Sequence, residues 1–265
     1  MIGFFGESAA APQWKITASA RTHIGLVRAV NEDRILNRAD CGLWAIADGM
    51  GGYSRGDVAA DAVIHALAQL ANAAGPVTAD QLCTALREVN RLVHAFPLDS
   101  TGHSGSTVAG LQISGQQAFF FWAGDSRIYR HRQGGLEAMT HDHRVVQEMI
   151  DAGVLDPRSA RDHPRASVIT RAVGAHPTLS LALLHDSVEC GDTYLLCSDG
   201  LTDLVDDDRI GSILNLAPFD AADTLLNAAL LAGGRDNVSM IVVGVRQRGE
   251  INLAWNGPQV QATRS

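Results

Sequence analysis

The sequence predicts an α+β layered fold, in which antiparallel sheets pack together and helices cover their outer faces. Three observations favour it. Short apolar segments are grouped and joined by brief turns, which is typical of antiparallel strands. Segments with helical spacing are grouped too, instead of alternating one for one with strands. The 265 residues, 46% hydrophobic and 19% charged, are enough to fill the core of one large domain.

The first half of the chain predicts two strands and then two helices. The strands are expected at 15–22 and 41–47, with a polar connection at 28–33. A helix at 56–73 would place on one apolar face Val58, Ala62, Val63, Ala66, Leu67 and Leu70. A second helix opens with Thr78 and Gln81 in capping-box register. Its apolar side would carry Leu82, Ala85, Leu86, Val89, Leu92 and Val93.

The second half begins with a block of three strands, at 107–113, 117–123 and 127–132. The turn signals Ser114-Gly115 and Gln133-Gly134-Gly135 lie between and after them, and neighbouring strands should pair antiparallel. A helix at 143–152 would end at Gly153, a natural C-cap. The remaining strands are predicted at 180–184, 193–198 and 238–245, with a helix at 220–232.

Three segments have little apolar periodicity. Residues 155–167 contain two prolines and predict an ordered surface excursion. Residues 1–14 are expected to be an N-terminal extension and 247–265 a loose tail, which leaves one domain at 15–246. The acidic run is interpreted as a solvated helix start; it comprises Asp203, Asp206, Asp207 and Asp208.

Composition excludes several classes of function. The net charge of −8 and the lack of a basic stripe argue against nucleic acid or an acidic membrane as partner. The sequence contains no run of about 18 consecutive apolar residues, so no membrane span is expected. The first 15 residues also lack the basic region of a signal peptide. The cysteines form no CxxC pair, so free thiols in a reducing compartment are expected at Cys41, Cys83, Cys190 and Cys197. A soluble, cytoplasmic, monomeric protein is the expectation.

Four aspartates follow or interrupt apolar runs in similar settings: Asp48, Asp125, Asp199 and Asp236. If these strand ends converge on one edge, the carboxylates repel each other unless cations lie between them. Oxygen-only ligand sets suit the hard ions Mg²⁺ and Mn²⁺. The pattern therefore predicts a multi-metal carboxylate site, although Asp48-Gly49 alone is also an ordinary turn.

Seven motifs stand in the order found in metal-dependent protein phosphatases of the PPM (PP2C-like) type, and the chain resembles the compact bacterial members from about Thr17 to Val245. These motifs are Arg28-Ala-Val-Asn31-Glu32-Asp33, Ala47-Asp48-Gly49-Met50-Gly51-Gly52, Gly105-Ser106-Thr107, Gly124-Asp125-Ser126-Arg127, Ile169-Thr170-Arg171-Ala172-Val173-Gly174, Ser198-Asp199-Gly200-Leu201 and Arg235-Asp236-Asn237. The resemblance implies a four-layer α-β-β-α sandwich with two central antiparallel sheets flanked by helices.

The resemblance also implies metal-binding roles for named residues. Asp48 would bridge two ions, the Gly49 carbonyl would bind one of them, and Asp199 and Asp236 would bind the other. Asp125, together with Asp199, would hold a third, weaker ion. Glu32 and Asp33 would lie near the ions and would contact them partly through bound water. Asn237 would brace Asp236. The Gly105-Ser106-Thr107 motif is interpreted as close packing or strand initiation, without a catalytic role.

The implied chemistry is hydrolysis of a phosphomonoester by a metal-bridging water or hydroxide that attacks phosphorus directly. Divalent ions lower the pKa of water and offset the phosphate charge. Arg28 is the natural phosphate clamp because its planar fork matches phosphate oxygens, although it is also interpretable as an exposed charge. Animal relatives place a His directly after the Asp-Gly pair, where this chain has Met50. The leaving oxygen would then take its proton from metal-bound water or from one of His141, His143 and His163; His143 alternatively caps its helix.

Residues 150–175 correspond to the mobile flap of the family, which would influence substrate choice. Within it, His163 is a candidate substrate-facing residue, and Arg171 would either brace the flap or contact substrate. The implied activity is that of a Mn²⁺- or Mg²⁺-dependent protein serine/threonine phosphatase opposing bacterial kinases. Its partner would be a phosphorylated kinase loop or a forkhead-associated-domain protein. Some members of this size accompany type VI secretion regulation, but nothing in the sequence points to that pathway.

Three alternatives remain. A pseudophosphatase would keep the fold as a phosphoprotein-binding module, but degenerate members usually lose a metal aspartate, and all are present here. A PPM phosphatase of a partner-switching stress cascade would share the chemistry, but such proteins usually carry sensor domains for which the chain has no room. A two-metal phosphoesterase acting on nucleic acid is disfavoured by the acidic balance.

Overall fold

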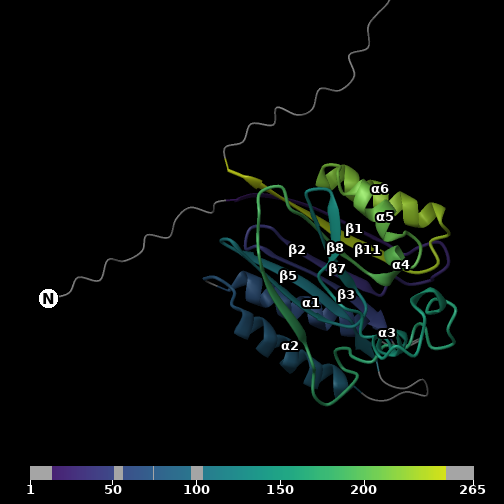
Figure 1. The fold of residues 1–265 in the computed structure, drawn as a ribbon. Helices are drawn as coiled ribbons and strands as arrows, with labels where there is room; N and C mark the ends of the chain where they lie inside the picture. The colour runs from purple at the N-terminus through teal and green to yellow at the C-terminus, as the bar shows by residue number, and fades with distance from the viewer. Residues whose placement is uncertain (1–13, 51–55, 74, 97–103, 249–265) are drawn as a thin grey trace, which may run out of the picture.

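Two antiparallel sheets form the centre of the molecule, and helices lie over both outer faces (Figure 1). The computed structural model describes residues 14–50, 56–73, 75–96 and 104–248. The first sheet has the order β1 (Trp14–His23), β11 (Val238–Gln247), β10 (Thr193–Cys197), β7 (Arg127–Arg132) and β8 (Gly135–Ala138). The second has the order β2 (Asp33–Arg38), β3 (Leu43–Met50), β5 (Val108–Ser114), β6 (Gln117–Ala123) and β9 (Ala182–Ser187), with β4 (Gly105–Ser106) beside β3.

The helices divide between the two outer faces. α1 (Gly56–Asn72) and α2 (Ala79–His94) cover the second sheet, whereas the first sheet is covered by α4 (Asp199–Thr202), α5 (Asp207–Ile213) and α6 (Pro218–Leu231). α3 (Val145–Asp151) and a 3₁₀ turn, η1 (Pro157–Ser159), lie in the connection between β8 and β9. No helix in the described ranges combines the length and apolar character of a membrane span.

Three apolar clusters match the four layers. Between the sheets pack Trp44, Ile46, Phe120, Tyr194, Leu196 and Ile241, with others. On β10 the neighbouring residues Leu195 and Cys197 face the opposite way, toward α4, α5 and α6. This alternation is the period of two that a strand requires when both of its faces are buried. The predicted α-β-β-α sandwich is confirmed.

The helix predictions are right in position and partly wrong in face. Thr78 caps α2, and the capping box with Gln81 is formed. On α1 the buried face contains Ala59 and Ala60, while Val58 is 43% exposed. On α2, Leu92 is also exposed. Small residues allow α1 to approach β3 closely, and this packing outweighs the spacing of the larger aliphatic residues.

The strand predictions missed two edge strands and one change of sheet. β2 and β8 have few buried apolar residues, so their pattern is weak. β6 and β7 are consecutive but do not pair, because the chain passes from the second sheet to the first at 124–126. Gly124 has φ of +118° there, and a Cβ on it would lie 2.6 Å from the Thr107 methyl group. The expected antiparallel pairing is confirmed for β5 and β6, which the Ser114-Gly115 turn joins, and is wrong for β6 and β7.

None of the four cysteines, all of which lie in the described ranges, forms a disulfide; Cys83 and Cys197 are buried, Cys41 is half-buried and Cys190 is exposed. Of the predicted extension and tail, the structure describes only Trp14, Gln247 and Arg248. Gly51 and Gly52 also lie outside the described residues.

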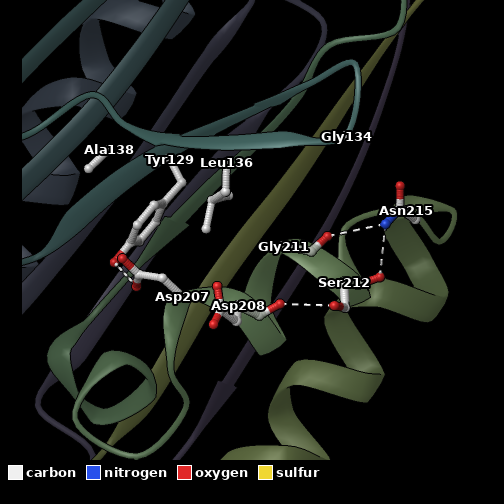
Figure 2. Close-up of a pocket in the computed structure, with 9 residues that line it drawn as sticks. All are labelled: Tyr129, Gly134, Leu136, Ala138, Asp207, Asp208, Gly211, Ser212 and Asn215. Atoms are coloured by element: carbon white, nitrogen blue, oxygen red, sulfur yellow. Dashed lines mark hydrogen bonds between the residues drawn. The ribbon is translucent and has the colours of Figure 1, made fainter.

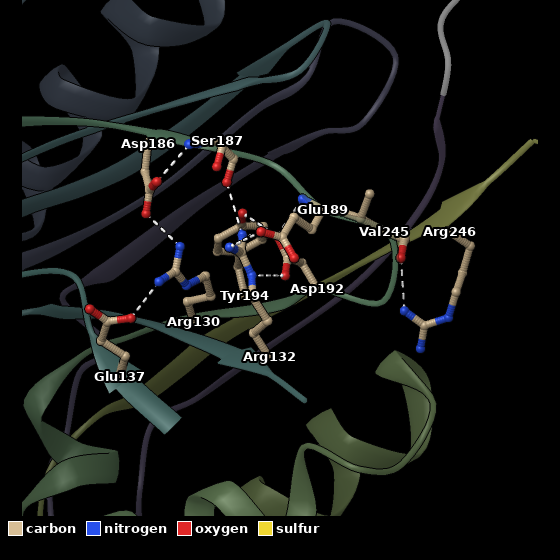
Figure 3. A network of polar contacts seen from close by, with 10 residues as sticks. All are labelled: Arg130, Arg132, Glu137, Asp186, Ser187, Glu189, Asp192, Tyr194, Val245 and Arg246. Carbon is tan, nitrogen blue, oxygen red and sulfur yellow. Dashed lines mark hydrogen bonds and ion pairs between the residues drawn. The ribbon is translucent and has the colours of Figure 1, made fainter. Parts of the chain in front are cut away.

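An ion-pair network links the two sheets (Figure 3). Arg130 on β7 binds Asp186 on β9 in the other sheet. Arg132 forms a two-pronged pair with Asp192 at 2.7 Å for each contact, and its Nη2 also donates to the Ser187 carbonyl. Asp192 is fully buried and also accepts from the Tyr194 hydroxyl at 2.9 Å. The network therefore fixes how the sheets lie against each other.

Candidate metal and phosphate site

Asp33 and Asp48 enter the site from paired positions on β2 and β3. The backbone of Asp48 is held by Thr107, whose Oγ1 accepts from the Asp48 N–H at 3.0 Å and whose N–H donates to the Asp48 carbonyl at 2.8 Å. Ser106 Oγ donates to the same carbonyl. The Gly105-Ser106-Thr107 motif thus fixes the end of β3, as the packing interpretation expected.

Asp199 and Asp236 come from the ends of neighbouring strands in the first sheet. Asp199 begins α4 just after β10, and Asp236 precedes β11. The two segments touch at Gly200, where a Cβ would lie only 1.9 Å from the Asn237 carbonyl oxygen. Glycine at this position therefore permits the approach of Asp199 to Asp236. Asp125 lies at the crossing between the sheets, and its side chain is 2% exposed.

Mutual repulsion shows that these carboxylates converge. Burial raises the pKa of the Asp48 carboxyl well above its ordinary value, and four neighbouring carboxylates raise it further: Asp33, Asp199, Asp125 and Asp236. Burial likewise raises the pKa of Asp199, with Asp125 as the largest of the repelling charges. Charges shift one another's pKa in this way only at short range. Residues nearly two hundred positions apart therefore share one acidic site.

The donor set fits a pair of divalent ions. It consists of carboxylate and carbonyl oxygens, the ligands preferred by Mg²⁺ and Mn²⁺. Asp33 is 2% exposed, and among the described residues its Oδ1 has no hydrogen-bond partner, whereas Oδ2 accepts from Ser198 Oγ at 2.9 Å. Burial raises the pKa of Asp33 to about 6. Buried, mutually repelling oxygens with an orphaned acceptor are stabilised by cations.

Two arginines supply positive charge to this site. Arg28 Nη2 donates to Asp236 Oδ2 at 2.6 Å, and its side chain is 54% exposed. Arg144 donates through Nε to Asp125 and through Nη2 to Asp199, the latter at 2.8 Å. Within the part of the chain that the structure describes, no three His, Cys, Asp or Glu side chains already stand in a metal-holding arrangement. Three of the carboxylates are paired with these guanidinium groups instead: Asp125, Asp199 and Asp236.

The sequence reasoning missed Arg144. It lies inside a predicted helix, and a single charged residue there gives no signal of a buried role. In the structure its backbone is extended, with φ of −115° and ψ of 148°, and the helix begins at Val145.

Asn237 has a wider role than the predicted brace. Its N–H donates to Asp236 Oδ1 at 2.8 Å, which supports that carboxylate. Its side-chain Nδ2 also donates to the carbonyls of Ile24 and Val30, and its Oδ1 accepts from the Glu32 N–H. Asn237 thereby ties the loop that carries Arg28 and Glu32 to the end of β11.

His143 is a poor candidate for the general acid. It stacks on Trp122 with ring centroids 6.1 Å apart, and its Nδ1 accepts from the Gly124 N–H at 3.1 Å. Burial and the nearby Arg171 guanidinium lower the pKa of His143 to about 4. The imidazole is therefore neutral at pH 7 and supports the crossing between the sheets.

His163 and Arg171 occupy different settings in the flap. His163 is half-buried, and its Nδ1 accepts from the Arg165 N–H two residues on. Arg171 is exposed, and its Nη1 lies 3.4 Å from His143 Nε2. Neither contact joins the carboxylate set.

We expect His143 to make the protein less stable below pH 6.5. Its pKa is about 4 in the folded chain against 6.5 for a free imidazole, so the unfolded chain binds this proton more readily. The free energy of unfolding should therefore fall as pH drops from 6.5 toward 4, by about 3 kcal/mol at most from this group. Urea unfolding at a series of pH values measures the slope.

A matched pair of variants isolates the effect of His143. His143→Gln keeps an acceptor for the Gly124 N–H but cannot titrate, so its slope should be flatter. His65→Gln changes an exposed histidine on α1, whose imidazole contacts Gln69, and should keep the parent slope. Equal slopes for the parent and His143→Gln would contradict the assignment.

A separate hollow of about 300 Å³ lies between β8 and α5, and no predicted site residue lines it (Figure 2). Asp207 on its wall accepts from the Tyr129 hydroxyl at 3.0 Å. Asp206 caps α5 by accepting from the Arg209 N–H, which confirms the helix-start interpretation for Asp206, Asp207 and Asp208, whereas Asp203 ends α4. These groups already have structural partners.

Comparisons with known proteins agree with this geometry. Residues 23–224 match the sequence model of the family described as Protein phosphatase 2C. The chain is 39% identical over 236 residues to the serine/threonine protein phosphatase PstP of Mycobacterium tuberculosis, which covers 86% of this chain and 44% of PstP. The chain thus spans less than half the length of that relative.

Two solved structures have closely similar folds. PppA, a regulatory component of type VI secretion in Pseudomonas aeruginosa, superposes with a TM-score of 0.79 at 38% identity, covering 87% of this chain and 97% of PppA. The catalytic domain of PstP in complex with two manganese ions gives 0.79 at 35% identity, covering 88% and 100%. Two antiparallel sheets flanked by helices are the fold that these phosphatase structures share with this chain. The chain belongs to the protein phosphatase 2C family.

Proposed function

We propose that this protein is a Mn²⁺- or Mg²⁺-dependent phosphatase that hydrolyses phosphoserine and phosphothreonine in proteins. The observation that carries the proposal is the convergence of Asp48, Asp199 and Asp236 in one acidic site, where the segments of Asp199 and Asp236 touch at Gly200. Membership of the protein phosphatase 2C family and the two manganese ions in the PstP structure support it.

Asp48, the Gly49 carbonyl, Asp199 and Asp236 would hold two ions. When bound, such ions make water nucleophilic at neutral pH and offset the charge of the phosphate. Arg28 would orient the substrate. Its exposed guanidinium now donates to Asp236 and would donate to the phosphate oxygens instead when substrate binds, because phosphate accepts paired N–H donors as a carboxylate does. Glu32 and Asp33 stand behind the ligands, where Asp33 is fixed by Ser198.

The proton for the leaving oxygen comes from water. Met50 has no proton to donate, and the lowered pKa of His143 leaves its imidazole uncharged. An ordered water in the acidic site meets the requirement without a dedicated side chain.

The substrates we propose are proteins phosphorylated by bacterial Ser/Thr kinases, including a kinase loop or a forkhead-associated-domain protein. The likeness to PppA makes regulation of type VI secretion a pathway to test. We propose a cytoplasmic monomer.

The choice between Mg²⁺ and Mn²⁺ depends on which ion the cell supplies, because both ions bind oxygen ligands of this kind. A third ion would need Asp125 and Asp199, which Arg144 already binds.

Hydrolysis of a phosphothreonine peptide tests the function. We expect phosphate release by the parent chain with Mn²⁺, none in excess chelator, and at least about a hundredfold less from Asp236→Asn, which loses a charged ligand. Asp61→Asn, which changes a surface carboxylate paired with Arg34, is the control and should match the parent. Equal rates in all conditions would remove the metal mechanism. Activity in none would favour a phosphoprotein-binding module.

A further inference from the structure

Arg144 is the least exposed arginine at the acidic site, with 12% of its side chain accessible. Its Nε donates to Asp125 Oδ2, and its Nη2 donates to Asp199 Oδ2 at 2.8 Å. A third carboxylate, that of Asp203, lies 3.6 Å from Nη1. One guanidinium therefore spans the two aspartates from which the family resemblance would build a third ion site.

The guanidinium is a permanent charge in this position. Burial alone lowers the pKa of Arg144, but the carboxylates of Asp125, Asp199 and Asp203 raise it above its usual value. A planar fork with several donors satisfies carboxylates in fixed directions, which a mobile lysine does not. A divalent ion entering between Asp125 and Asp199 would meet this fixed positive charge at contact distance.

The backbone of Arg144 also closes the base of the flap. Arg144 forms an antiparallel bridge with Ile169. On either side of it, the Val145 N–H donates to the Val168 carbonyl at 2.9 Å, and the Thr170 N–H donates to the His143 carbonyl at 2.7 Å. The segment at 145–168, which contains α3 and the excursion at 155–167, therefore starts and ends beside the residue whose side chain holds Asp125 and Asp199.

We propose that Arg144 takes the place of the third divalent ion: it neutralises Asp125 and Asp199, excludes an ion from between them, and ties the flap to the acidic site. The inference rests on the proposed two-ion phosphatase site. It is an alternative to the expectation that Asp125 serves as a metal ligand. Arg144 is a positioning residue, and the flap of this chain keeps its place without a third ion.

Counting bound ions tests the proposal without any turnover. Equilibrium dialysis against saturating Mn²⁺, followed by metal analysis, should give two ions for the parent and for Arg144→Lys, which keeps the charge. Arg144→Ser should bind three, and Arg144→Ser with Asp125→Asn should return to two. Arg38→Ser removes an arginine that is bidentate to Asp40 at the other end of β2, and it should stay at two.

Hydrogen exchange of the amides at 153–167 gives a second measurement. In the parent, exchange should not change as Mn²⁺ rises beyond what the two sites need. In Arg144→Ser it should become faster at low Mn²⁺ and slow again as the third ion binds. Circular dichroism confirms that each variant is folded.

Several results would overturn the proposal. Three ions in the parent chain would do so without any variant, and so would two ions in a folded Arg144→Ser. If the parent chain binds two ions but hydrolyses no phosphopeptide, the proposed phosphatase function is contradicted, whereas the proposal that Arg144 replaces a third ion is not.

Discussion

Asp48→Asn should abolish phosphatase activity and at the same time stabilise the metal-free protein. The variant loses the carboxylate expected to bridge both ions, so we expect kcat to fall at least about a hundredfold. Without divalent ions, the same change removes a buried charge that four neighbouring carboxylates repel. The metal-free variant should therefore have a higher free energy of unfolding than the parent at pH 7.

The sign of this effect follows from linkage. Because the pKa of Asp48 is raised in the folded chain, its stabilising contribution is present at low pH and is lost as pH rises. The advantage of Asp48→Asn should therefore vanish below about pH 3.8, where both chains are uncharged at this position. Thermal unfolding in chelator across pH measures it. A variant that keeps its activity, or that is less stable than the parent at pH 7 in chelator, would contradict the placement of Asp48.

Asp192→Ala should be the most destabilising single change outside the core. Asp192 is fully buried and holds the Arg132 fork, the Tyr194 hydroxyl and the Glu189 N–H. Its removal leaves Arg132 partly buried without its main counter-charge, at 19% side-chain exposure. Breaking a buried pair on one side costs about 3–5 kcal/mol. Urea unfolding of both chains measures the difference.

Glu189→Gln is the matched control for Asp192→Ala. Glu189 also binds Arg132, at 2.6 Å, but it is 49% exposed, and such pairs contribute about 0–1 kcal/mol. We expect a small loss for this variant. An equal loss of the free energy of unfolding in the two variants would contradict the claim that burial makes the Asp192–Arg132 pair the stronger one.

The acidic site could be predicted from the sequence because its residues mark the ends of apolar runs. Asp199 begins α4 directly after β10, and Asp48 lies near the end of β3, two residues before Met50; both strands were recognisable by their buried residues. Strand ends constrain where a side chain lies, so the four aspartates could be expected at one edge before any coordinates were known.

Arg144 and the sheet assignment of β7 could not be predicted in the same way. The apolar spacing after Arg144 indicates a helix but does not say that the residue before it is extended and paired with Ile169. The short connection at 124–126 suggests a hairpin, whereas tertiary packing sends β7 to the other sheet. Both features depend on contacts between distant segments, which local patterns do not encode.

The crossing of the chain at 124–126 makes the acidic site a joint property of both sheets. Asp33 and Asp48 belong to one sheet, Asp199 and Asp236 adjoin strands of the other, and Asp125 lies on the crossing itself. Neither half of the sandwich contains a complete ligand set. Loss of ion binding should therefore coincide with the first slippage between the halves, so that catalytic competence reports on the integrity of the whole domain.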